Sequence, residues 1–349
     1  MDAWDFLVDR TDLRRTRLAA ASGAPELADG QALLEVESFA LTANNITYGA
    51  IGDQLGYWKF FPAPDGWGRI PAWGFARVVR SRAEGVAEGL RLFGYWPMST
   101  HLVAELRPTA AGYVDAAPHR AELPPTYNAY SPAPEEDIDD YRSLLRPLFG
   151  TGYLIDDMLS EDPAVTSLVV SSASSKTALS LAWCARRRGL PVTGLTSAAH
   201  AERLRGLGIY SDVVTYDDIA GLQAPAGAAY VDFAGRSEIN GQVHQALGAA
   251  LVRSVIVGLT HWEGIGGPPP QTGPAPVFFF APDQIQKRSK ELGPAEFGRR
   301  FDQGLRDFVA DAGWLKLQHH RGAEALGAVY ADVLEGRVRP DEGHIVSPR

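Results

Sequence analysis

The sequence predicts an α/β fold in which a doubly wound parallel sheet, covered by helices on both faces, is joined to a β-rich domain. From residue 165 onward, short apolar segments alternate with longer segments of helical composition. The apolar segments have the length of strands and end at glycine or polar residues. Such alternation builds parallel sheets, whose ligands lie at the carboxyl ends of the strands. Before residue 130, Gly, Pro and Trp are crowded, which predicts short strands and irregular loops.

Each expected helix of the sheet domain has a local end signal. Arg186, Arg187 and Arg188 close the first helix with charges that suit the helix dipole, and Gly189 can cap it. Gly208 closes the second helix. The expected strands are 165–170, 191–195, 212–216, 228–233 and 251–257, and the expected helices are 176–188, 198–207 and 238–249.

The rest of the chain predicts a second, β-rich domain and the linker and helix that join it to the parallel sheet. A linker at 131–137 leads into a helix at 138–159, broken near Pro147 and Gly150. Because 349 residues exceed the usual size of one core, we expect two domains. Further elements are expected as strands at 32–37, 76–81, 277–280, 314–318 and 343–347 and as helices within 283–311 and 323–335.

Composition limits the partners of the protein. The net charge of −9 would be repelled by nucleic acid and by anionic membranes, although it permits a local basic pocket for a phosphate. The single cysteine, Cys184, cannot form an intrachain disulfide, which fits a reducing compartment. The N-terminus lacks the pattern of a signal peptide, and no apolar run approaches the roughly 20 residues of a membrane span. We therefore expect a cytoplasmic protein with a small-molecule substrate and no nucleic-acid or membrane partner.

The turn after the first strand of the sheet, residues 171–177, predicts a phosphate site. Serine and alanine stand where the dinucleotide fingerprint G-x-G-x-x-G has glycines. Small residues keep the turn open, serine hydroxyls can donate to phosphate, and the following helix directs free N–H groups at an anion. This pattern indicates a Rossmann-type dinucleotide-binding domain, with cofactor contacts expected from Ser172, Ser174, Ser175, Lys176 and Thr177.

Two other interpretations of this turn remain open. In the first interpretation, the turn is a polar strand–helix connection that binds no ligand. In the second it is a degenerate P-loop, because Ser175, Lys176 and Thr177 mimic the G-K-[ST] ending. Against the P-loop, both glycines are missing and no clear acidic magnesium partner follows the third strand.

The end of the second strand favours NADP(H) over NAD(H). NAD-binding proteins usually place Asp or Glu about 20 residues after the glycines, on the ribose hydroxyls. Here Thr196 and Ser197 stand at that place, and a neutral end of this kind tolerates a 2′-phosphate. Arg203, with His200, can pair with that phosphate. The alternative is that both are solvated helix residues.

The chain resembles the medium-chain dehydrogenase/reductase superfamily in the order of its domains and in residues 196–208, 230–235 and 255–259. More narrowly, residues 44–48, 57–62 and 73–76 resemble a bacterial family known only as a domain of unknown function. The resemblance implies that residues 1–135 and 313–349 form a GroES-like, β-rich substrate domain and that residues 136–312 form a hinge helix and the Rossmann-type domain. It leaves the oligomeric state open, with a homodimer along a sheet edge as the arrangement it favours.

Zinc, which some branches of this superfamily bind, does not fit this sequence. One cysteine cannot form the four-cysteine cluster of the zinc-dependent branches, and Cys184 reads as a core residue. The remaining histidines show no pair at metal-ligand spacing beside carboxylates; they are His101, His119, His244, His261, His319, His320 and His344. The zinc-independent quinone-reductase and enoyl-reductase branches are the nearer comparison.

Residues 44–48 also resemble the N-P-x-D segment that lines the active site of the superfamily. The resemblance implies Tyr48 as proton donor, Tyr57 as second choice, and Asn45 as a hydrogen-bonding partner of a carbonyl or ribose hydroxyl. Alternatively, Asn45 stabilises a turn and both tyrosines pack in the core. After the fifth strand, Gly258 and Thr260 are expected beside the nicotinamide, and His261 is either a general acid or solvated.

The aromatic residues of the first domain have two interpretations. They form an apolar substrate pocket or they fill the core, and they are Trp58, Phe60, Phe61, Trp67, Trp73 and Phe75. The patterns predict an NADP(H)-binding protein, and the resemblance implies a zinc-independent oxidoreductase that acts on a quinone, enone or enoyl-type substrate. The alternative is a non-catalytic nucleotide-binding protein that retains the reductase fold.

Overall fold

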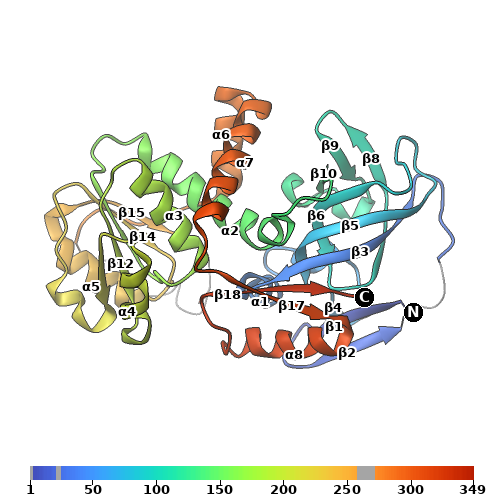
Figure 1. Cartoon of the computed structure of the whole chain (residues 1–349), viewed down its shortest axis with the longest axis horizontal. Helices are drawn as coiled ribbons and strands as arrows, with labels where there is room; N and C mark the ends of the chain where they lie inside the picture. The colour runs from blue at the N-terminus through green and yellow to red at the C-terminus, as the bar shows by residue number, and fades with distance from the viewer. Residues whose placement is uncertain (1–2, 21–24, 258–271) are drawn as a thin grey trace. The chain divides into compact units, whose positions relative to one another are not determined.

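The computed structural model describes residues 3–20, 25–257 and 272–349 (Figure 1). The chain divides into two compact units, one of residues 1–144 with 315–349 and the other of residues 145–314. The sequence places these divisions after residues 135 and 312. No helix of the described ranges is long and apolar enough to cross a bilayer.

The second unit is built on a six-stranded parallel sheet with the order β13-β12-β11-β14-β15-β16. Its strands are β11 (Ser167–Val170), β12 (Val192–Thr196), β13 (Asp212–Thr215), β14 (Ala228–Asp232), β15 (Leu251–Ile256) and β16 (Val277–Phe278). Its helices are α3 (Lys176–Arg187), α4 (Ala198–Leu207), α5 (Ser237–Leu247), α6 (Ala281–Leu292), α7 (Pro294–Asp311) and the short η4 (Tyr216–Gly221) and η5 (Gly248–Ala250). This arrangement confirms the doubly wound α/β class.

Side chains of the central strands feed two separate cores. Leu168 and Val170 of β11 belong to one apolar cluster, whereas Val169 belongs to the cluster on the opposite face. Because successive side chains of a strand point to opposite faces, a sheet covered on both sides needs apolar residues at every position. This requirement explains why the strands read as continuous apolar runs in the sequence.

Helix α2 (Asp139–Ser160) runs unbroken through Pro147, where the sequence predicts a break. A proline inside a helix removes one main-chain hydrogen bond, and packing offsets that loss. At Gly152, an added Cβ would lie 2.2 Å from Oγ of Ser180 on α3, and at Gly150 it would meet the Phe301 ring at 3.4 Å. These glycines therefore permit close helix packing rather than ending the helix.

The first unit is β-rich, as expected for a GroES-like domain. A nine-stranded sheet has the order β17-β18-β3-β5-β6-β10-β9-β8, with β7 also paired to β3, and a three-stranded sheet has the order β2-β1-β4. The C-terminal strand β18 pairs with β3 in antiparallel fashion, which returns the end of the chain to this unit. Its strands are β1 (Trp4–Asp9), β2 (Thr16–Ala20), β3 (Ala32–Leu41), β4 (Trp67–Gly68), β5 (Pro71–Ser81), β6 (Arg91–Pro97), β7 (His101–Ala104), β8 (Leu106–Thr109), β9 (Gly112–Asp115), β10 (Ala129–Pro132), β17 (Lys316–Arg321) and β18 (Glu342–Ser347). Its helices are α1 (Ala43–Ala50), α8 (Gly322–Leu334), η1 (Tyr57–Lys59), η2 (Pro118–Arg120) and η3 (Pro125–Tyr127).

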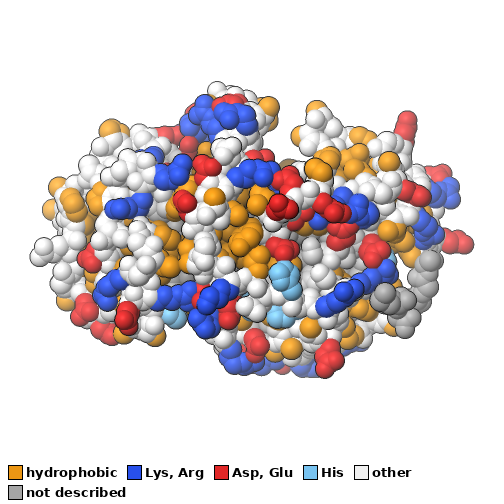
Figure 2. All heavy atoms as spheres, in the orientation of Figure 1, with side chains coloured by type: hydrophobic (Ala, Val, Ile, Leu, Met, Phe, Trp, Pro, Cys, Tyr) orange, Lys and Arg blue, Asp and Glu red, His pale blue; other side chains and the backbone are white. Residues whose placement is uncertain are grey.

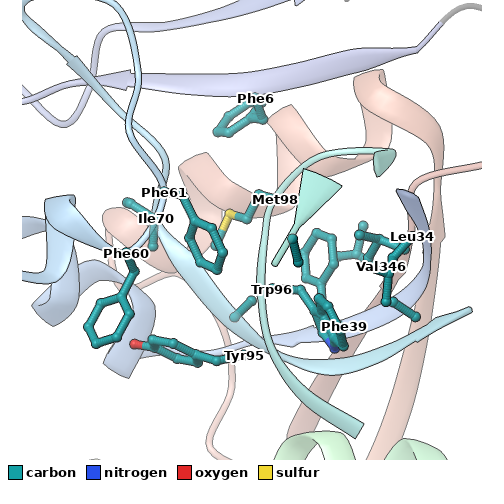
Figure 3. Close-up of a cluster of buried hydrophobic side chains, with 14 of the residues drawn as sticks. Phe6, Leu34, Phe39, Phe60, Phe61, Ile70, Tyr95, Trp96, Met98 and Val346 are labelled. Atoms are coloured by element: carbon teal, nitrogen blue, oxygen red, sulfur yellow. The ribbon is translucent and has the colours of Figure 1, made fainter. Parts of the chain in front are cut away.

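Aromatic side chains fill the core of this unit (Figure 3). Trp58, Phe60, Phe61 and Phe75 are buried, which confirms the core-filling interpretation for these four residues. The phenyl ring of Phe60 stands perpendicular to that of Tyr95, with their centroids 5.5 Å apart. Trp73 is only half-buried.

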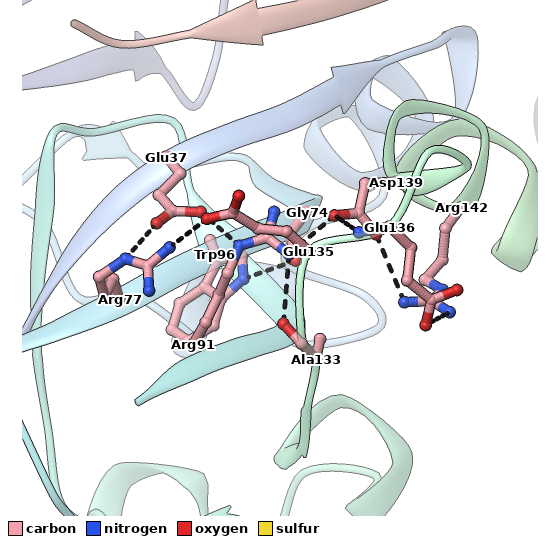
Figure 4. Close-up of polar contacts among 10 residues, drawn as sticks. All are labelled: Glu37, Gly74, Arg77, Arg91, Trp96, Ala133, Glu135, Glu136, Asp139 and Arg142. Carbon is pink, nitrogen blue, oxygen red and sulfur yellow. Dashed lines mark hydrogen bonds and ion pairs between the residues drawn. The ribbon is translucent and has the colours of Figure 1, made fainter. Parts of the chain in front are cut away.

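An arginine–carboxylate network ties the linker before α2 to the sheet (Figure 4). Glu37 on β3 binds Nε of Arg77 and Nε of Arg91, each at 2.6 Å. Arg91 also contacts Asp139 at the start of α2, at 2.8 Å, and lies over the ring of Phe75. The side chain of Arg91 is only 10% exposed, so this guanidinium is the central member of the network.

Replacing Arg91 should therefore destabilise this unit. In Arg91→Met, Glu37 and Asp139 lose their shared partner in a site largely removed from water, and we expect the free energy of unfolding to fall by about 2–3 kcal/mol. Urea denaturation measures this loss. Arg107→Met is the control, because Arg107 on β8 is exposed and has no ion-pair partner within the described ranges, and it should change stability by less than about 0.5 kcal/mol. Equal effects of the two substitutions would contradict the prediction.

Candidate functional site

The order of the parallel sheet reverses between β11 and β14. The chain passes from β11 outward to β12 and β13, then returns to β14 on the other side of β11. In open α/β sheets, ligands bind beyond the carboxyl ends of the strands at such a switch point. The loops that follow β11 and β14 therefore form the first candidate region.

A buried hydrogen bond joins these two loops. The Ser171 hydroxyl, directly after β11, donates to Oδ1 of Asp232 at 2.7 Å. The Ser171 oxygen accepts the N–H groups of Phe233 and Ala234, at 2.8 and 3.0 Å, and Asp232 Oδ1 also accepts that of Ala234. Ser171 is fully buried and Asp232 nearly so. The Ser171 hydroxyl thus joins the two loops at the switch point, and no sequence pattern marked Asp232 as its partner.

The next residue, Ser172, has an unusual backbone. Its φ of 47° lies in the left-handed region, where a glycine of the usual fingerprint would sit without strain. Its N–H donates to the hydroxyl of Tyr216 at 2.8 Å. Tyr216 begins η4 after β13, and its residue type alone did not reveal it as a neighbour of the turn.

The rest of the turn presents unsatisfied groups at the start of a helix. Ser175 is the N-cap of α3, and its Oγ accepts the N–H of Ala178 at 3.2 Å. Within the described ranges, the Ser174 side chain and the N–H groups of Ser174 and Thr177 make no hydrogen bond. Lys176 is the first residue of α3 and is half-buried. Free N–H groups at a helix start are a ready site for an anion.

The expected 2′-phosphate residues lie at the same sheet edge, because the strands are parallel. Thr196 is the last residue of β12 and is buried, and Ser197 is the N-cap of α4 without a side-chain capping bond. Arg203 is half-buried on α4. The expected residues Gly258 and Thr260, like His261, lie outside the described residues.

In the first unit, Asn45 holds α1 in place. Its Nδ2 donates to the main-chain oxygen of Pro71 at 2.8 Å, and its Oδ1 accepts the N–H of Thr42, the N-cap, at 2.7 Å. The segment therefore begins a helix where the sequence predicted an active-site segment or an isolated turn. These bonds occupy both ends of the amide, and contact of Asn45 with a substrate stays a prediction.

Tyr48 and Tyr57 come together with two tyrosines that the sequence did not single out. We call Tyr48, Tyr57, Tyr95 and Tyr127 the tyrosine cluster. The rings of Tyr48 and Tyr57 are 4.6 Å apart, those of Tyr48 and Tyr95 5.7 Å, and those of Tyr95 and Tyr127 4.9 Å. Burial raises the pKa of the Tyr48 and Tyr57 hydroxyls well above the ordinary value, so both are protonated at neutral pH. Such hydroxyls can donate a proton and do not act as bases.

The described histidines and the cysteine are not arranged as a metal site. No group of three or more His, Cys, Asp or Glu side chains in the described ranges has the geometry to hold a metal. His319 bonds Asp140 at 2.7 Å, while its neighbour His320 bonds His344 at 3.1 Å. Burial raises the pKa of the Cys184 thiol, which lies inside α3.

A polar hollow of about 460 Å³ lies on the large sheet of the first unit, lined by Glu35, Val36, Glu37, His319, His320, Arg321, Ser347 and Arg349. Its charges largely pair with one another or with adjacent residues, such as Glu35 with Arg349 at 2.8 Å. Figure 2 shows cationic and anionic side chains interspersed over the face drawn. None of the residues expected from the sequence lines this hollow, so the candidate regions remain the turn and the tyrosine cluster.

Comparison with known proteins gives a family and a fold. Residues 39–339 match the family described as "Protein of unknown function (DUF2855)". No curated protein matches the chain.

Similar solved structures are reductases or proteins bound to NADPH. CurA from Vibrio vulnificus, in complex with NADPH, is 12% identical with a TM-score of 0.64, covering 99% of both chains. A Bacillus thuringiensis protein assigned as an NADPH:quinone reductase is 14% identical with a TM-score of 0.62, again over 99% of both chains. A mutant enoyl thioester reductase from Candida tropicalis is 12% identical with a TM-score of 0.59, covering 99% of this chain and 100% of that one. At these identities the likeness establishes the fold, which is that of the quinone and enoyl reductases.

The Ser171–Asp232 bond should be a strong contributor to the stability of the second unit. Asp232→Ala removes the acceptor of the buried Ser171 hydroxyl and one acceptor of the Ala234 N–H, and we expect a loss of about 2–4 kcal/mol in urea denaturation. Asp217→Ala is the matched control, because Asp217 is exposed and makes no side-chain hydrogen bond within the described ranges. A loss no larger than that of the control would contradict the role given to Asp232.

Proposed function

The chain belongs to the DUF2855 family, whose description names no activity. From the geometry of the site we propose that the protein is an NADP(H)-dependent oxidoreductase. In this proposal a hydride passes to an activated double bond or carbonyl of a quinone, enone or enoyl-type substrate. The observation that carries it is the start of α3, with free N–H groups, at the switch point of the sheet.

The residues of the turn fit the pyrophosphate of a dinucleotide. The N–H groups of Ser174 and Thr177 have no partner within the described ranges, and the hydroxyls of Ser174 and Ser175 can donate. Tyr216 accepts the N–H of Ser172 through its oxygen, and its own proton has no acceptor in the same ranges. Lys176 opposes the helix dipole in the first turn, a placement that a bound anion would stabilise.

The end of β12 supports NADP(H) rather than NAD(H). NAD-binding proteins usually have a carboxylate at this place, which would repel a 2′-phosphate. Thr196 and Ser197 place neutral hydroxyls there instead, and Arg203 on α4 would pair with the phosphate. CurA, a similar structure, is in complex with NADPH, which supports the same choice. Gly258 and Thr260 stay proposed contacts of the nicotinamide side.

The chemistry divides between cofactor and protein. Bound NADPH would supply the hydride. Tyr48, protonated at neutral pH, would donate the proton that completes the reduction, with Tyr57 as the second choice. Asn45 fixes α1 and with it the position of Tyr48. A small-molecule substrate, a homodimer and a cytoplasmic location belong to the same proposal.

One observation favours a second function, a non-catalytic nucleotide-binding protein. Tyr216 already occupies the N–H of Ser172, and a serine takes the left-handed place of a glycine. These two changes to the turn would be tolerated in a protein that no longer catalyses a reaction. Binding of NADPH without its oxidation, across a panel of quinones, enones and enoyl thioesters, would favour this second function.

Reversing the charge of Lys176 should weaken NADPH binding. We expect Lys176→Glu to raise the dissociation constant at least about tenfold, because a carboxylate would face the phosphates. Fluorescence titration with NADPH measures the constant. Lys290→Glu gives the matched control, since Lys290 is exposed on α6 and has no ion-pair partner within the described ranges. Equal affinity of Lys176→Glu and the parent protein would count against this placement of the phosphates.

Removing the hydroxyl of Tyr48 should slow turnover without weakening the binding of NADPH. We expect Tyr48→Phe to lower kcat by about 10²–10⁴, the usual contribution of a general acid, with an unchanged dissociation constant for NADPH. Stopped-flow oxidation of NADPH with the best substrate of the panel measures kcat. Tyr57→Phe should cost less. Retained turnover in Tyr48→Phe would exclude Tyr48 as the donor.

A further inference from the structure

Two buried hydrogen-bond donors without partners lie beside Tyr48. We propose that Trp73 and Tyr95 are positioning residues, whose N–H and O–H groups stabilise the phenolate that Tyr48 becomes when it gives up its proton. This inference rests on the proposed role of Tyr48 as proton donor.

The two donors differ from the donors of two nearby aromatic residues. Nε1 of Trp73 and Oη of Tyr95 are buried and have no hydrogen-bond partner among residues 3–20, 25–257 and 272–349. By contrast, Nε1 of Trp96 donates to the main-chain oxygen of Gly74 at 2.9 Å, and the hydroxyl of Tyr130 donates to the main-chain oxygen of Tyr95 at 3.1 Å. An unsatisfied buried donor costs about 1–3 kcal/mol, so this unit tolerates a cost at Trp73 and Tyr95 that it avoids at Trp96 and Tyr130.

Backbone register aligns the two donors on one side of the sheet. Trp73 on β5 and Tyr95 on β6 are directly paired residues of adjacent antiparallel strands. Side chains paired in this way point to the same face, and their rings are 5.0 Å apart. The ring of Tyr48 meets that of Tyr95 edge-on at 5.7 Å. Tyr95 is fully buried and held by Phe60, which limits its movement (Figure 3).

The polar groups around Tyr48 favour its anion. Interactions with Trp73, Tyr95 and Asn44 each lower the pKa of the Tyr48 hydroxyl, against burial, which raises it more. Tyr57 from η1 and Tyr127 from η3 complete the groups packed on the ring or acting on its hydroxyl, and no charged side chain is among those that shift its pKa. A phenolate at Tyr48 would therefore depend on hydrogen bonds alone.

The proton transfer gives the two unpartnered donors a role. When the substrate accepts the hydride, its displaced electron pair takes up a proton, the O–H bond of Tyr48 breaks, and the bonding pair stays on the Tyr48 oxygen. Hydrogen bonds to an ionised acceptor are shorter and about twice as strong as neutral ones. Trp73 and Tyr95 would make such bonds only in this state, which lowers the barrier, and a proton from water then restores the hydroxyl.

Titration of Tyr48 in the protein without cofactor tests the proposal independently of activity. A multiply fluorinated tyrosine is placed at position 48, because its lower pKa brings ionisation into the range where proteins stay folded, and fluorine NMR follows the midpoint. We expect Trp73→Phe and Tyr95→Phe each to lower the acid dissociation constant of Tyr48 about tenfold, since each removes a donor to the anion. Tyr113→Phe, which removes a hydroxyl that donates to Gly85 outside the cluster, should not move the midpoint.

A double-mutant cycle gives the second measurement. Tyr95→Phe should slow turnover about tenfold in the parent protein and have no effect in a Tyr48→Phe background. An unmoved midpoint in both donor variants, or equal slowing in both backgrounds, would overturn the proposal. Should Tyr95→Phe not fold, Trp73→Phe carries both measurements. A shifted midpoint in a protein that does not bind NADPH would contradict the proposed function and still support the donor arrangement.

Discussion

The buried hydrogen bond between Ser171 and Asp232 fixes the geometry on which the nucleotide proposal depends. It joins the ends of β11 and β14, the two strands between which the sheet reverses. Ser171 also accepts two main-chain N–H groups of the loop after β14, so one hydroxyl sets the path of both loops. Since α3 begins five residues after Ser171, this bond helps to set the direction of its free N–H groups. A carboxylate that would otherwise repel phosphate is at the same time engaged by donors.

In the serine-rich turn, a serine adopts the left-handed backbone conformation that a glycine usually provides. An L-residue in the left-handed region is strained by roughly 1–2 kcal/mol, and Ser172 accepts this strain at φ 47°. The hydrogen bond from its N–H to Tyr216 offsets part of that cost and holds the turn before any ligand arrives. In the first unit the tyrosine cluster follows the opposite logic, because there burial without charges keeps the phenols protonated. The serine-rich turn is thus suited to bind an anion, and the tyrosine cluster is suited to donate a proton.

Local signals in the sequence predicted much of this architecture. The helix at 198–207 and its closing glycine have the predicted bounds, with Gly208 at φ 68°, because periodicity and capping are properties of neighbouring residues. The break at Pro147 was wrong, since packing of α2 against α3 and α7 outweighs one lost hydrogen bond. Helix α1 was missed for the same reason: its anchor is the bond from Asn45 to Pro71, far along the chain. Tyr216, Tyr95 and Tyr127 reach their places only through pairings between distant segments, so no motif could have named them.

Amide hydrogen exchange across residues 172–178, with and without saturating NADPH, tests the central claim most directly, because it reports on the N–H groups assigned to the phosphates. The account predicts that the amides of Ser174 and Thr177 exchange more slowly once NADPH is bound, since phosphate oxygens would accept them. The amide of Ser172, already bonded to Tyr216, should change less. Unchanged exchange at Ser174 and Thr177 under saturating NADPH would contradict the placement of the cofactor at this turn.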